Sequence, residues 1–213
     1  MAMLSLENFF DPKKEGLIYL LYGVKTVLTG ALIVAIWGRL PSFRLTSPWG
    51  SLGVGSIVFI LWVFLDPYLP WIEGFFHFTW AAEGGFRESG FRPWEFVENF
   101  YLALVVISLR VIGAVIVVPI VEELFWRGWL QRWLINENFT SVRIGQFTPF
   151  SFAVVTVMFA LVHPQVFVAL FAGLLFGWWV VKTKSLWDVV LSHAVANLLL
   201  AVYVLWTGRW YFW

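Results

Sequence analysis

Four polar side chains in the second half of the chain are of types that could activate a water molecule together. Glu122, His163, His193 and Asn197 lie in segments that are otherwise strongly apolar. Ionisable groups are costly in hydrocarbon, so each of them indicates a partner or a use. A glutamate can take a proton from water, and histidine and asparagine can stabilise the oxyanion of a tetrahedral intermediate. The set therefore predicts hydrolysis by an activated water.

The same residue types also allow a metal site. Glu122, His163 and His193 could bind zinc through one carboxylate oxygen and two ring nitrogens, which leaves one position for water. The residues alone therefore leave a zinc-dependent and a metal-free mechanism open. Cysteine is absent, which excludes disulfides, thiolate metal sites and a cysteine nucleophile. There is also no Gly-x-Ser-x-Gly motif to indicate a serine nucleophile.

Helical spacing separates the roles of two adjacent glutamates. Glu123 and Arg127 are four residues apart, so on a helix they share one face and predict an ion pair. Glu122 points about 100° away from Glu123 and is not on the arginine's face. We therefore predict that Glu123 and Arg127 support the helix, and that Glu122 is available for chemistry.

Two further pairs have the same spacing. His193 and Asn197 project from one face of a later helix, and Phe159 lies one turn before His163 on another. Three separate helices must therefore meet to assemble the predicted site.

The composition indicates what kind of elements position these residues. Of 213 residues, 61% are hydrophobic and 13% are charged, which predicts an all-α, polytopic transmembrane bundle of about six to eight helices. The net charge of +1 provides no basic field for nucleic acid. We expect a multi-pass protein of a bacterial or archaeal cell membrane, with lipid around it; the oligomeric state stays open.

The apolar runs predict seven helices and a division near residue 97. Residues 1–97 should hold the N-terminal membrane helices and a polar loop, and residues 98–213 the helical core with the site, in one compact membrane domain. Short connections after residue 98 predict antiparallel neighbours. We expect a break at Pro119 and a short interfacial helix within 71–97; the helices should span about 16–38, 50–70, 98–118, 120–135, 147–163, 166–181 and 186–206.

The segment 147–181 must form two helices around the turn that holds His163. Sixteen residues extend about 24 Å, less than a hydrocarbon core of about 30 Å. Either the hairpin does not fully cross the membrane, or its turn lies below the membrane surface. Irregular backbone at that depth is tolerated beside a wet cavity, so we predict a cavity next to His163.

Three short motifs resemble those of one family of intramembrane proteases. "EELFWR" is similar to its Glu-Glu-x-x-x-Arg motif, "FALVH" to its Phe-x-x-x-His motif and "HAVAN" to its His-x-x-x-Asn motif. The family is the CAAX protease and bacteriocin-processing family, also called the Abi family, which includes CAAX prenyl protease-related members. The motifs occur in the family's order over residues 122–197, and residues 1–95 match none of them.

The resemblance implies a role for each matching residue. It implies that Glu122 activates water with His163, that His193 and Asn197 form the oxyanion side, and that the supporting residues are Glu123, Arg127 and Phe159. It further implies an intramembrane endopeptidase acting on a hydrophobic or lipidated peptide. The resemblance does not decide between zinc and a metal-free glutamate mechanism. The alternatives are a proton-coupled transporter and a non-catalytic immunity or binding protein.

Overall fold

The described part of the chain is helical and contains no strand. The computed structural model describes residues 15–68, 100–163 and 165–212. The predicted all-α class is confirmed; the predicted helix within 71–97 lies outside the described residues. The α-helices are α2 (Glu15–Ile36), α3 (Pro48–Leu65), α6 (Phe100–Ile112), α7 (Val118–Glu123), α8 (Gln131–Trp133), α9 (Pro149–Leu161), α10 (Val166–Thr183) and α11 (Leu186–Thr207), and short 3₁₀ turns cover Trp37–Arg39, Asp66–Tyr68, Phe139–Ser141 and Trp210–Phe212.

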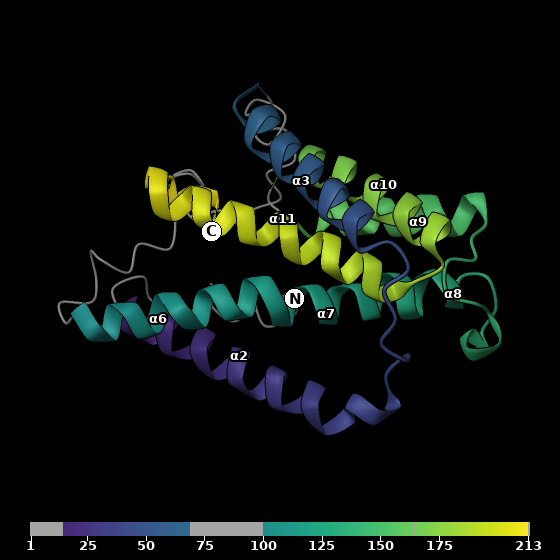
Figure 1. The fold of residues 1–213 in the computed structure, drawn as a ribbon, viewed down its shortest axis with the longest axis horizontal. Helices are drawn as coiled ribbons and strands as arrows, with labels where there is room; N and C mark the ends of the chain where they lie inside the picture. The colour runs from purple at the N-terminus through teal and green to yellow at the C-terminus, as the bar shows by residue number, and fades with distance from the viewer. Residues whose placement is uncertain (1–14, 69–99, 164, 213) are drawn as a thin grey trace.

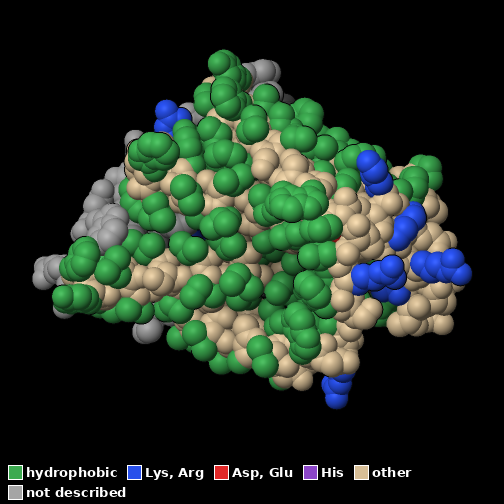
Figure 2. Space-filling model, in the orientation of Figure 1, with side chains coloured by type: hydrophobic (Ala, Val, Ile, Leu, Met, Phe, Trp, Pro, Cys, Tyr) green, Lys and Arg blue, Asp and Glu red, His purple; other side chains and the backbone are tan. Residues whose placement is uncertain are grey.

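Within those residues, five helices are long and apolar enough to cross a membrane. They cover Leu21–Arg39, Pro48–Tyr68, Phe100–Trp133, Val166–Thr183 and Leu186–Thr207. Hydrophobic side chains cover much of the visible face of the bundle (Figure 2). Such a surface suits lipid rather than water, and the protein is an integral, multi-pass membrane protein.

Helix α9 is the short member of the bundle. Its 13 residues extend about 20 Å, less than the hydrocarbon thickness of about 30 Å. This is the short first arm that was predicted for the hairpin around His163. His163 follows directly after this helix, beside a cavity that is described below.

The predicted break at Pro119 is wrong. One continuous helical rod runs from Phe100 to Trp133, and Pro119 lies inside it (Figure 1). A proline lacks an N–H and its ring clashes with the carbonyl four residues earlier. Here a π-helical segment, Gly113–Val117, precedes the proline and widens the turn, so the rod continues instead of ending.

Helix α11 lies at the centre of the bundle and packs on both halves of the chain. It crosses α3 and contacts α10 and the long rod, while α2 packs along α6 (Figure 1). The α3 crossing is close because Gly55 has no side chain: a Cβ there would overlap the carbonyl oxygen of Ser192. The N-terminal helix α3 is therefore an integral part of the packed core.

A buried carboxylate fixes this arrangement. Asp188, in the first turn of α11, accepts from the backbone N–H of Thr46 at 2.7 Å and of Ser47 at 2.8 Å. It also accepts from the hydroxyls of Thr46 and Ser51, and Trp179 donates to the Ser51 hydroxyl. The start of α3 is thus tied to α11, which determines where α3 reaches the site.

Candidate active site

Glu123, Arg127 and His193 form a fully packed cluster at the centre of the bundle. Arg127 Nη1 contacts both carboxylate oxygens of Glu123 at 3.0 Å, and Glu123 is 0% and Arg127 1% exposed. The predicted ion pair is therefore present. Glu123 has a second partner that the spacing did not predict, because His193 Nδ1 lies 2.9 Å from its Oε1. Since a carboxylate accepts, we assign the proton on Nδ1 of His193 to this bond.

Aromatic rings and one backbone carbonyl enclose this cluster. The Arg127 guanidinium lies over the Phe159 ring, 4.6 Å from its centroid, and donates from Nη2 to the Gly173 carbonyl at 3.3 Å. The Phe176 ring stacks on His193 with centroids 5.0 Å apart. These contacts, with the bond from His193 Nδ1 to Glu123 and the ion pair of Glu123 with Arg127, hold His193 in one orientation.

Glu122 and His163 face each other across a short gap. Their Oε2 and Nε2 atoms are 3.9 Å apart, too far for a direct hydrogen bond. His163 Nδ1 lies 2.6 Å from the Phe159 carbonyl, which can only accept, so Nδ1 carries the proton and Nε2 of the neutral ring is an acceptor. A water about 2.8 Å from each atom would donate to both acceptors.

Glu122 Oε2 itself is buried and has no hydrogen-bond partner within the described residues. A buried acceptor in that state is unfavourable unless water or a ligand donates to it. This agrees with the prediction that Glu122, unlike Glu123, is not used by the ion pair.

Asn197 is held by the irregular turn before Pro119. Its Nδ2 donates to the Ala114 carbonyl at 2.7 Å. In the π-helical segment Val118 N–H bonds to Gly113, and the next residue, Pro119, has no N–H to offer Ala114. The asparagine supplies that missing donor, and its second amide hydrogen is left for another acceptor.

We expect Asn197→Ala to lower the stability of the fold as well as any activity. The Ala114 carbonyl would lose its donor, which costs about 1–3 kcal/mol when the group stays buried. Thermal unfolding in detergent measures this. The exposed Asn136→Ala variant is the control; equal unfolding temperatures for both variants would show that the Ala114 bond contributes nothing.

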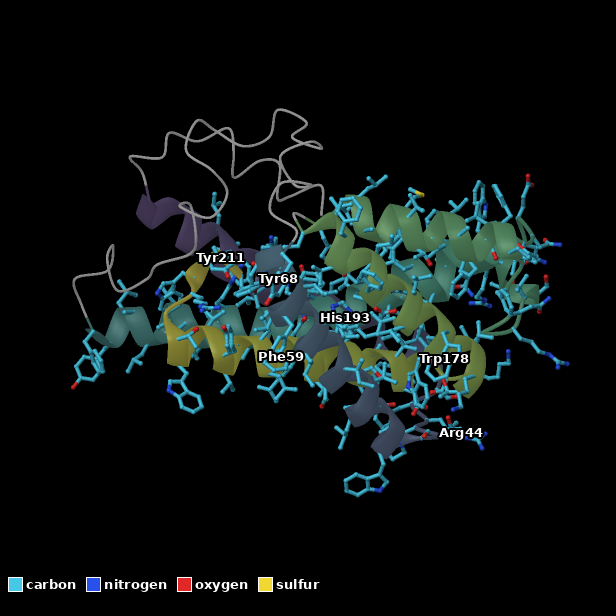
Figure 3. The ribbon with its side chains drawn as sticks, turned by 90° about the horizontal axis from the view of Figure 1, so that it is seen from above. Arg44, Phe59, Tyr68, Trp178, His193 and Tyr211 are labelled. Carbon is cyan, nitrogen blue, oxygen red and sulfur yellow. The ribbon has the colours of Figure 1, made fainter. Side chains whose placement is uncertain are left out.

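One cavity of about 320 Å³ brings the predicted residues together. Glu122, His163, His193 and Asn197 all line it, and Figure 3 shows His193 in the interior of the bundle with Arg44 at its edge. The cavity predicted next to His163 is therefore present. It also has walls that no sequence motif marked: Tyr22 and Lys25 from α2, Trp62 from α3 and Arg110 from α6.

The residues suggested for zinc do not form a three-ligand set in this arrangement. No group of three or more His, Asp or Glu side chains in the described ranges is placed to hold a metal ion. Nδ1 of His193 is bonded to Glu123, which leaves Nε2 as the only nitrogen of that ring that a metal could use. Glu122 and His163 alone would supply two ligands, fewer than the three protein ligands of catalytic zinc sites.

Comparison with known proteins agrees with the motifs. Residues 102–199 match the family described as type II CAAX prenyl endopeptidase Rce1-like. The chain is similar to that family over this Rce1-like segment. No curated protein and no solved structure matches the chain.

The Rce1-like segment contains every predicted site residue. It begins in α6 and ends in α11, so it includes the stretch from Glu122 to Asn197. Helices α2 and α3 lie outside it, although both line the cavity. Part of the cavity wall is therefore built by residues that the family match does not cover.

Proposed function

We propose that the protein is an intramembrane endopeptidase in which Glu122 activates the hydrolytic water without a metal. The single observation that carries this proposal is the pair of acceptors, Glu122 Oε2 and His163 Nε2, 3.9 Å apart in the wall of the cavity. Two acceptors at that distance suit one water molecule, and a carboxylate is a suitable base for it.

The reaction follows from the placement of these groups. Glu122 takes one proton from the water, while His163 Nε2 accepts a hydrogen bond from the O–H that remains. The hydroxide attacks the peptide carbonyl carbon, and the resulting oxyanion receives the second amide hydrogen of Asn197 and the Nε2–H of His193 in its doubly protonated form. Glu122 then returns the proton to the departing amine as the C–N bond breaks. Glu123 and Arg127 hold His193 throughout.

The substrate in this proposal is a hydrophobic or lipidated peptide. The cavity lies in a bundle whose helices suit a bilayer, and most of its wall is apolar, with residues such as Val58, Phe59 and Leu200. We propose a CAAX prenyl protease-like specificity, for a C-terminal prenylated peptide, and the match of residues 102–199 to the Rce1-like family supports it. Purified protein in detergent should cleave such a peptide, and mass spectrometry of the products identifies the bond.

A chelator separates the two mechanisms. If Glu122 works without metal, dialysis against a strong zinc chelator should leave cleavage within about 2-fold of the untreated protein, and added zinc should not increase it. Catalytic zinc would instead supply the activated water, so its removal would abolish turnover. Loss of cleavage with the chelator and recovery on zinc addition would overturn the metal-free proposal while leaving the endopeptidase assignment intact.

A further inference from the structure

Helix α3 brings one tryptophan into the cavity from outside the family segment. Val58, Phe59 and Trp62 line the cavity, and they lie three, four and seven residues after Gly55, where α3 touches α11. That spacing places all of them on one face of the helix. The close approach to α11 at Gly55 therefore turns this face toward the site.

Trp62 contacts a residue of the proposed reaction. Its ring meets the His163 ring edge to face, with centroids 5.9 Å apart and planes at 71°. It also packs against the hydrophobic core that includes Phe159 and Phe176. The ring is thus fixed beside the pair that holds the water.

Among the described residues, the indole N–H of Trp62 has no hydrogen-bond partner, although its nitrogen is buried. A buried tryptophan normally finds an acceptor for this group, because leaving it unpaired is unfavourable. A phenylalanine ring, although smaller, could make an edge-to-face contact with His163 without that cost. The donor therefore indicates a ligand that enters the cavity.

A peptide supplies the matching group. Each residue of an extended peptide carries one carbonyl acceptor, and the other cavity groups near His163 are arranged for the water and the oxyanion. We infer that Trp62 is a substrate-binding residue whose Nε1–H donates to a backbone carbonyl of the peptide, next to the bond that is cleaved. This inference rests on the proposed endopeptidase function, and it assigns α3 a part in substrate binding.

The first variant removes the N–H together with one ring of the indole. Trp62→Phe keeps an aromatic ring beside His163; we expect its KM to rise by about 3- to 10-fold, the effect of one neutral hydrogen bond, with kcat within about 2-fold. Trp178→Phe is the matched control, because Trp178 is 46% exposed on α10 and does not line the cavity. Should Trp62→Phe fold poorly, benzothienylalanine at position 62 retains the indole shape and lacks the donor.

A modified substrate identifies the acceptor. In a series of peptides, each carries a single thioamide, a weaker acceptor, in place of one carbonyl near the cleaved bond. For the wild type, the KM should rise for the peptide in which the thioamide replaces the carbonyl that Trp62 binds. The same peptide should leave the KM of Trp62→Phe unchanged relative to its oxygen parent. The inference would be overturned if Trp62→Phe had the KM of the wild type for the unmodified peptide, or if only its kcat fell.

Binding keeps this test independent of turnover. The dissociation constant of the same peptide, measured by fluorescence anisotropy with Glu122→Gln protein, should rise by the same factor when Trp62→Phe is added. If the wild type cleaves the peptide and the two dissociation constants are equal, the Trp62 inference is wrong and the proposed function is unaffected. If the wild type does not cleave but the constants differ, the proposed chemistry fails and Trp62 still binds peptide.

Discussion

Glu122→Gln should reduce peptide cleavage by about 10²- to 10⁴-fold, the contribution of a general base. Glutamine keeps the shape of the side chain and an oxygen that can accept a hydrogen bond, but it cannot take a proton from water at neutral pH. The variant should therefore fold normally and bind the peptide. The measurement is the initial rate of cleavage by purified protein in detergent, with the unfolding temperature recorded on the same preparation.

A second substitution shows whether Glu122 acts together with His163. The two side chains lie 3.9 Å apart and act on one water in the proposed reaction, so the losses caused by Glu122→Gln and His163→Ala should be far from additive. A transporter would show substrate flux and no cleavage, and an immunity protein would tolerate both changes. Turnover close to that of the wild type in Glu122→Gln would exclude the proposed mechanism.

Removing either partner of the buried ion pair should destabilise the fold by roughly 3–5 kcal/mol. Glu123 and Arg127 are both buried. Glu123→Gln would therefore leave the Arg127 guanidinium without its carboxylate partner. Arg127→Ala would leave the Glu123 carboxylate without its guanidinium partner. Lower yield and a lower unfolding temperature in detergent are the expected results.

The control for this prediction is Arg143→Ala, which removes an exposed arginine on the loop before α9. Glu123→Gln should also reduce cleavage in protein that is still folded, because Glu123 holds His193. Wild-type unfolding temperatures in both ion-pair variants would show that the pair has no structural role.

The local features of the site were predictable because helical geometry determines them. Glu123 and Arg127 are four residues apart, and any α-helix brings such residues together. The same rule separated Glu122 from the ion pair and placed Phe159 beside His163. The helices themselves follow from apolar runs long enough for a bilayer, and the cavity beside His163 from the short length of α9.

The error at Pro119 has a definite cause. Local propensity treats a proline inside a helix as a break, because the ring removes a hydrogen bond. The rod continues because Gly113–Val117 widens into a π-helical segment and Asn197, 83 residues away in sequence, donates to the Ala114 carbonyl. A partner from another helix cannot be read from the sequence around the proline.

By itself, then, the sequence determined that this is an all-α membrane protein. It also determined which residues could carry out chemistry and which pairs lie one helical turn apart. Only the tertiary structure decided the partners between helices: His193 with Glu123, Glu122 opposite His163, and Trp62 in the cavity wall. The physical reason is that contacts within a helix depend on a fixed rise and rotation per residue. Contacts between helices depend on where they cross, and here Gly55 and the buried Asp188 determine that for α3 and α11.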